Sequence, residues 1–164
     1  MKKFISILLL IAVLVSLCAC GGNNEEAAAD PAATLDPQSP EAMYGHIDQT
    51  QKIDGVYKIW NKDGVYNMLE NPSDSFELLC HVDMEGAEIA PIREFTGTLN
   101  GQNSTIKNFT VKGSDETDFG FIGVNKGKIS NLYLDNATLI AGNSAKNIGA
   151  FVGKNEGTLR AYQT

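Results

Sequence analysis

The sequence predicts a mainly β protein organised as a solenoid, with a short helix ahead of the repeated strands. Three observations support this fold class: an internal repeat, short stretches in which apolar and polar residues alternate, and glycines spaced too closely for helices. Residues 121–129 align without a gap with residues 151–159, thirty positions later, and most aligned pairs match in identity or type. A period of this length with short strands is typical of solenoid proteins.

An earlier and looser copy of the repeat covers residues 95–101 and 105–111. We align the end of this copy with residues 128–134, and this alignment makes Asn108 and Asn131 equivalent, each following an inward isoleucine. A corner asparagine can hydrogen-bond the backbone and stack on its counterpart in the next coil. We therefore expect an asparagine ladder at these two positions.

The repeated segments are predicted to be strands. Residues 109–111 and 132–134 alternate apolar and polar side chains, as expected where one face of a strand lies on a core. Glycines interrupt helices and permit the positive φ angles that tight corners require. They occur here at positions 97, 101, 120, 123, 127, 149, 153 and 157.

The spacing of glycine and asparagine resembles that of the GLUG-motif repeat proteins. The matching series are Phe-x-Gly-Thr-Leu-Asn-Gly at 95–101, Thr-Ile-x-Asn-Phe at 105–109 and Gly-Phe-Ile-Gly-x-Asn-x-Gly-x-Ile-x-Asn-Leu at 120–132. The resemblance covers roughly residues 55–159 and departs from the pattern at Ile92-Arg93, where many relatives have Ile-Gly. It implies a bacterial surface protein, often adhesin-like, with a right-handed parallel β-helix.

A capping helix is expected over residues 62–69. Asn61 is a favoured N-cap residue, one face of the segment carries Val65, Met68 and Leu69, and Asn71-Pro72 would stop the helix. Such a helix would cover the open end of the solenoid, as repeat proteins require for solubility. We therefore divide the folded part into a cap and first coil, residues 44–93, and GLUG-like repeats, residues 94–164.

The last segment departs from the repeat pattern. A constant thirty-residue offset places Ala161 on Asn131 and Tyr162 on Leu132, so this strand loses its corner asparagine and half of its apolar pattern. It is either a degraded terminal edge, which would discourage end-to-end pairing, or the end of a truncated piece of a longer surface protein.

Residues 1–19 are interpreted as a lipoprotein signal peptide. Two lysines precede an apolar run, residues 4–17, which is shorter than the roughly 20 residues of a membrane-spanning helix. Residues 17–20, Leu-Cys-Ala-Cys, resemble a bacterial lipobox, which implies cleavage before Cys20 and its acylation with diacylglycerol and palmitate. An ordinary secretory signal cut nearby is the alternative.

Residues 20–43 are predicted to be a flexible tether. Between Gly21 and about Pro40 the only large apolar side chain is Leu35, so this segment cannot bury enough apolar surface to offset the entropy of ordering. The lipid would hold the protein to a cell membrane, with the folded part on the extracytoplasmic face.

Charge and cysteine content limit the partners. Removing residues 1–19 leaves 11 basic against 20 acidic residues, a net charge of −9, so nucleic acid is not an expected partner. Cys80 has no other cysteine for an intramolecular disulfide once Cys20 is acylated. We expect Cys80 to be a small buried hydrophobe and the protein to be a monomer.

The sequence contains no recognisable catalytic constellation, and we expect no enzyme activity and no cofactor. His46 and His81, the latter in a predicted strand, have no two-histidine metal spacing, and no phosphate loop or nucleophile elbow is present. Asp115, Glu116 and Asp118 are candidate calcium ligands, although a solvated turn explains them better.

These observations favour a binding or structural function. The hypothesis is a cell-surface lipoprotein whose β-helix serves as an adhesion or ligand-binding module for host, matrix or glycan ligands. The ligand class rests on the family resemblance, because a fold does not determine a function. The alternative is an accessory segment of a surface carbohydrate-active enzyme or peptidase, for which Arg93 beside Glu94 is the nearest imitation of a polysaccharide-cleaving site.

Overall fold

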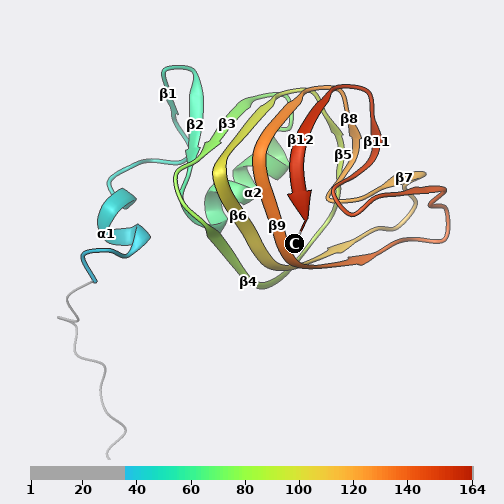
Figure 1. The fold of residues 1–164 in the computed structure, drawn as a ribbon, viewed down its shortest axis with the longest axis horizontal. Helices are drawn as coiled ribbons and strands as arrows, with labels where there is room; N and C mark the ends of the chain where they lie inside the picture. Colours follow the sequence, from blue (N-terminus) through green and yellow to red (C-terminus); the bar gives the residue numbers. More distant parts are fainter. Residues whose placement is uncertain (1–35, 164) are drawn as a thin grey trace, which may run out of the picture. The chain divides into compact units, whose positions relative to one another are not determined.

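The computed structural model describes residues 36–163, which form a mainly β fold of twelve strands and two short helices (Figure 1). The elements are α1 (Pro40–Tyr44), β1 (Lys52–Ile53), β2 (Val56–Ile59), α2 (Lys62–Glu70), β3 (Ser75–Leu78), β4 (Val82–Ile89), β5 (Ile92–Phe95), β6 (Thr98–Lys112), β7 (Asp118–Phe119), β8 (Ile122–Asn125), β9 (Lys128–Ile140), β10 (Asn147–Ile148), β11 (Val152–Asn155) and β12 (Thr158–Gln163). The prediction of a mainly β protein is confirmed. The predicted signal peptide, Cys20 and residues 21–35 of the predicted tether lie outside the described residues.

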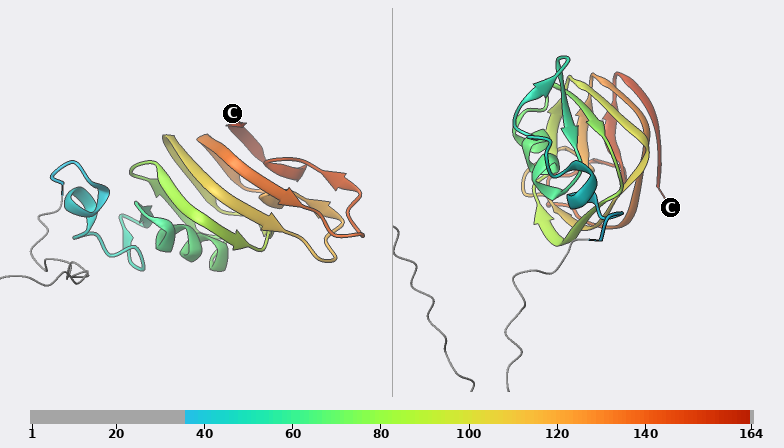
Figure 2. Two further views of the ribbon diagram at one scale, coloured as in Figure 1. Left: turned by 90° about the horizontal axis from the view of Figure 1, so that it is seen from below. Right: turned by 90° about the vertical axis from the view of Figure 1, so that its left-hand side faces the viewer.

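The strands fall into successive rows, and equivalent strands of neighbouring rows pair in parallel. The first row is β3, β4 and β5, the second is β6, β7 and β8, and the third is β9, β10 and β11. Strand β12 pairs in parallel with β9 and follows the third row. The long strands lie side by side in Figure 2. Among the described strands, β1 and β2 form the antiparallel pair.

The strand pairing produces three sheets, and each sheet contains strands from successive rows. The largest has the order β1-β2-β3-β6-β9-β12, with β4 also paired to β6. The second, β11-β8-β5, joins the ends of the rows, and the third is the short pair β10-β7. The first part of strand β6 pairs with β3 and its second part pairs with β4. The single strand β6 therefore spans the corner that separates β3 from β4 in the first row.

The core is made of apolar side chains stacked from row to row. Phe76, Leu99 and Ile129 are register partners on neighbouring strands, and each is at most 1% exposed. Phe121 contacts Phe109 and Phe151 edge to face, with ring centroids 5.6 and 6.0 Å apart. The alternation predicted from the sequence therefore places one face of each strand on a continuous core.

The helix predicted over residues 62–69 is confirmed as α2. The Asn61 side chain accepts hydrogen bonds from the backbone of Asp63 and Gly64, and Val65 and Met68 are fully buried. The helix contacts β2 and β4 at the N-terminal end of the rows (Figure 2). No helix in residues 36–163 has the length and apolar character needed to cross a bilayer.

The last four residues assigned to the tether, residues 40–43, lie in α1. Ser39 caps this helix by accepting a hydrogen bond from Ala42, and Pro40 occupies its first turn.

The repeated glycines serve close backbone approach rather than positive φ. Among the described residues, only Gly55 and Gly86 are glycines with positive φ. A Cβ on Gly127 would collide with the carbonyl group of Gly97, and one on Gly157 would collide with that of Gly127. The same two carbonyls accept hydrogen bonds from Lys128 and Thr158 at 2.9 Å, so the glycines let the rows approach closely enough for these bonds.

The predicted equivalence of Asn108 and Asn131 is wrong. The observed register pairs Lys107 with Asp135 and Phe109 with Ala137, so the counterpart of Asn108 is Asn136, whose amide donates to Asn108 at 2.7 Å. The reason is a bulge between Asn100 and Ser104, where β6 has three residues and β9 has one. An asparagine ladder exists, but between other partners than those predicted.

The offset predicted for the last strand is also wrong by one residue. Ala161 pairs with Leu132 rather than with Asn131, because β12 lacks a residue corresponding to Asn131. Asn131 has φ 54° and forms the bulge of β9. The shift places Ala161 against the core, where the constant offset would have put it at a corner.

Candidate functional site

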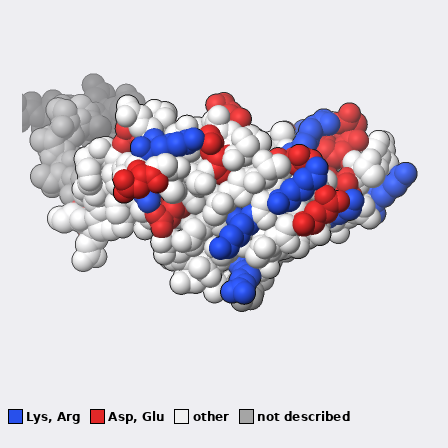
Figure 3. All heavy atoms as spheres, turned by 90° about the horizontal axis from the view of Figure 1, so that it is seen from above, with Lys and Arg blue, Asp and Glu red and all other residues white. Residues whose placement is uncertain are grey.

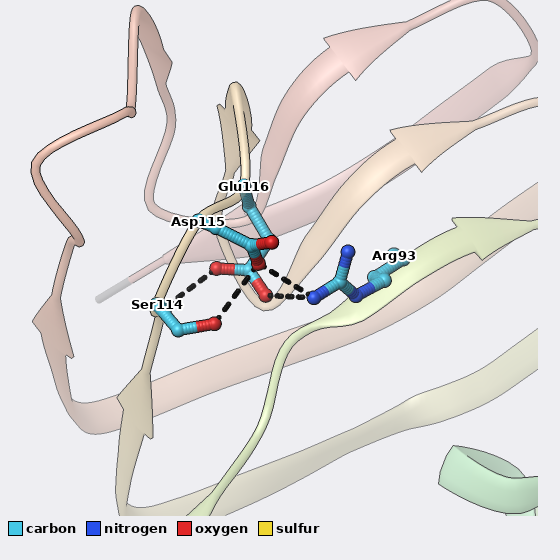
Figure 4. Close-up of polar contacts among 4 residues, drawn as sticks. All are labelled: Arg93, Ser114, Asp115 and Glu116. Carbon is cyan, nitrogen blue, oxygen red and sulfur yellow. Dashed lines mark hydrogen bonds and ion pairs between the residues drawn. The ribbon is translucent and has the colours of Figure 1, made fainter.

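Arg93 and an acidic loop form a polar cluster on one side of the rows (Figure 4). Arg93 lies on β5, and its guanidinium group contacts Asp115 at 2.7 Å and Glu116 at 3.2 Å. Both carboxylates come from the loop between β6 and β7, in the next row. The cluster therefore ties a loop of the second row to the first row.

Hydrogen bonds within the loop orient the two carboxylates. The Ser114 backbone donates to Glu116 at 2.6 Å, and the Ser114 hydroxyl donates to Asp115 at 3.0 Å. The pKa of Asp115 is lowered, first by Arg93 and then by Ser114. The pKa of Glu116 is also lowered, chiefly by the Ser114 backbone N–H, although burial of its side chain opposes this shift.

The three calcium candidates do not converge on one point. Asp115 and Glu116 face Arg93, whereas Asp118 accepts a hydrogen bond from Asn147 at 2.5 Å on β10. Within residues 36–163 no group of three or more His, Cys, Asp or Glu side chains is arranged to hold a metal ion. The contacts assign the acidic loop to an ion pair that joins rows.

Replacing Arg93 with Gln is expected to raise the pKa of Asp115 toward its ordinary value. The Arg93–Asp115 ion pair stabilises the folded chain at pH values above the ordinary carboxyl pKa. This stabilisation is lost as the pH falls through the lowered pKa of Asp115. The pKa of Glu116 should change less, because Ser114 dominates its shift. Carboxyl titration by NMR measures both, and Lys126→Gln is a control that removes a different ion pair. An unchanged pKa for Asp115 would contradict the assignment.

Cys80 and His81 lie between β3 and β4, not in a continuous strand as predicted. Cys80 is half-buried, its thiol donates to the Trp60 carbonyl at 3.1 Å, and burial raises the pKa of the thiol. His81 is exposed and accepts a hydrogen bond from the Thr105 backbone at 3.0 Å. A thiol with a raised pKa is a poor nucleophile, so these contacts are structural.

A polar groove crosses the three rows at their corners. It encloses about 380 Å³, and its lining residues are Asp83, Glu85 and Gly86 on β4, Asn108, Phe109 and Thr110 on β6, and Asn136 and Thr138 on β9. We call it the asparagine groove. Asn108 and Asn136 have φ of 59° and 46°, values that asparagine tolerates better than most residues.

The asparagine groove contains a directed chain of hydrogen bonds. Asn136 donates to Asn108 at 2.7 Å, and Asn108 donates to Asp83 at 2.9 Å. The pKa of Asp83 is lowered by the Glu85 backbone N–H and by Asn108. Among the described residues, no hydrogen bond to the Asn136 side-chain oxygen is found, so this oxygen can accept one from a ligand.

Charges elsewhere on the surface are largely paired between rows. Glu88 contacts Lys112 at 3.2 Å and Glu94 contacts Lys126 at 2.5 Å, and on the face drawn in Figure 3 many basic and acidic patches adjoin one another. Sequence reasoning missed the asparagine groove, since its residues come from segments 25 and 28 positions apart. The Asn108–Thr110 and Asn136–Thr138 triplets were the available signal.

These features define a class of protein: a mainly β chain of parallel, row-forming strands with a polar groove across the rows. No protein-family model and no solved structure matches the chain. It is similar to halomucin of Haloquadratum walsbyi, with 32% identity over an alignment of 132 residues that covers 71% of this chain. The matched region spans about 1% of the length of halomucin.

Proposed function

We propose that this chain is a cell-surface lipoprotein whose rows form a right-handed parallel β-helix of the GLUG type and serve as a ligand-binding or adhesion module. The parallel register of β5 with β8 and of β8 with β11 supports the solenoid. Its hand is proposed because parallel strands connected by a crossover are right-handed in nearly all proteins. The lipid anchor is proposed from the lipobox-like residues 17–20.

The asparagine groove carries the proposal. Its amide, carboxylate and hydroxyl groups match the hydrogen-bonding groups of a neutral glycan, which presents many hydroxyls and little charge. Thr110 and Thr138 are register partners, so the second and third rows present hydroxyls side by side in the groove. Adjacent hydroxyls of this kind suit a ligand that carries several hydroxyl groups along its length.

Binding of neutral oligosaccharides by residues 36–164 tests the proposed function. We expect Thr138→Val, which removes a hydroxyl at similar volume, and Asn136→Gly, which preserves positive φ, to weaken binding about tenfold each, because each leaves a ligand group unpaired. A glycan array followed by calorimetry makes the measurement. Thr98→Val is the matched control, since Thr98 is exposed on β6 outside the groove.

Two results would contradict the proposed function. The first is the absence of glycan binding by the wild-type fragment, and the second is an equal loss in Thr98→Val and Thr138→Val. Cleavage of the bound glycan would instead favour the alternative, an accessory segment of a carbohydrate-active enzyme. Metabolic labelling with palmitate, abolished by Cys20→Ala, tests the anchor separately.

A further inference from the structure

Three basic side chains in the described part of the chain have no carboxylate partner. Residues 36–163 contain eleven Lys and Arg residues, and eight of them form ion pairs with Asp or Glu. The three exceptions are Lys128, Lys146 and Arg160. Two of these, Lys128 and Arg160, line the same groove, and both are exposed.

The register of the large sheet explains why Lys128 and Arg160 lack partners. Lys128 on β9 lies between Thr98 on β6 and Thr158 on β12. Arg160 on β12 lies beside Ser130 on β9. The register partners that lead from Arg160 across β9, β6 and β3 end at Lys58 on β2. Lys58 lies beside Glu77 and forms an ion pair with it. Along this line of register partners, Lys58 therefore lies beside a carboxylate, whereas Arg160 lies beside a hydroxyl.

The groove at this place, the basic groove, is lined by Lys128, Ser130, Asn131, Thr158 and Arg160 and encloses about 500 Å³. None of its lining residues is acidic. Its two cations, two hydroxyls and one amide can all donate hydrogen bonds to the same ligand. This combination suits an oxyanion, since a guanidinium group and an ammonium group in one groove can both donate to a sulfate or carboxylate.

We propose that the basic groove binds the sulfate or carboxylate groups of an acidic polysaccharide. The rest of the molecule opposes a larger polyanion, because the whole chain has a net charge of −7. A nucleic acid would bring many phosphates against this acidic surface, whereas an acidic glycan can place single anionic groups between Lys128 and Arg160. The basic groove and the asparagine groove share no residue, so the two binding proposals stand independently.

Binding of the full-length chain to chondroitin sulfate and hyaluronate oligosaccharides, with dextran as the neutral probe, tests this proposal. We expect Lys128→Gln and Arg160→Gln each to weaken binding of the acidic probes about fivefold, the size of one exposed charge interaction. The affinity should also fall as NaCl is raised. Lys146→Gln is the matched control, because Lys146 is exposed, lacks a carboxylate partner and lies outside the basic groove.

The outcomes separate this proposal from the proposed function. Retained binding in the Lys128→Gln/Arg160→Gln double variant, or an equal loss in Lys146→Gln, would overturn the basic groove as the site. Tighter binding of a DNA oligonucleotide than of chondroitin sulfate at equal charge would also overturn it. Unchanged dextran binding by the double variant would support two separate sites, and competition by inorganic sulfate would support recognition of the anionic group itself.

Discussion

Replacing Phe121 with Ala is expected to lower the free energy of unfolding by about 3–5 kcal/mol, the range found for removal of a buried phenyl ring. Phe121 is fully buried, and its ring joins Phe109 of its own row to Phe151 of the next row. Truncation would leave a cavity between two rows and remove both edge-to-face contacts. Urea denaturation of residues 36–164 measures the change.

Ile148→Ala is the control for the Phe121 prediction. Ile148 is 62% exposed, so its truncation should change the free energy of unfolding by less than about 1 kcal/mol. If both substitutions have the same effect, or if Phe121→Ala costs less than about 1 kcal/mol, then the stacked aromatic residues do not hold the rows together.

Replacing Asn125 with Ala is expected to destabilise the fold by about 1–3 kcal/mol, because the hydrogen bonds of a fully buried side chain are lost. Asn125 lies at the end of β8, and its amide donates to Asn155 at 2.7 Å and to the Thr158 carbonyl at 3.2 Å. Its side-chain oxygen accepts from the Gly127 backbone at 3.1 Å. Alanine would remove this partner of the Thr158 carbonyl and one of the two acceptors of the Gly127 N–H, which also donates to the Phe95 carbonyl at 3.0 Å.

Asn147→Ala is the matched control for Asn125→Ala. Asn147 lies on β10, its side chain is exposed, and its amide donates to Asp118 on β7 at 2.5 Å. Water can replace this lost hydrogen bond, so the loss should stay below about 1 kcal/mol in thermal and urea denaturation. A loss for Asn147→Ala as large as that for Asn125→Ala would show that burial is not the source of the effect.

The asparagine groove could not be located from the sequence because two different asparagines satisfied the same local pattern. Asn108 and Asn131 each follow an isoleucine by two positions, yet the structure pairs Asn108 with Asn136. A bulge adds residues at a corner without changing the alternation of the strands on either side. The register is then decided by which apolar residues meet in the core, and this information is not local.

The sequence by itself determined the mainly β fold and the helix capped by Asn61, since alternation and capping act over a few residues. The glycines were recognised for the wrong reason, because the need for close approach depends on the neighbouring row. Only the tertiary structure decided which charges are paired. Arg93 pairs with Asp115 and Lys58 with Glu77, whereas Lys128 and Arg160 lie beside hydroxyls, because the parallel register brings together residues that are nineteen or more positions apart in the chain.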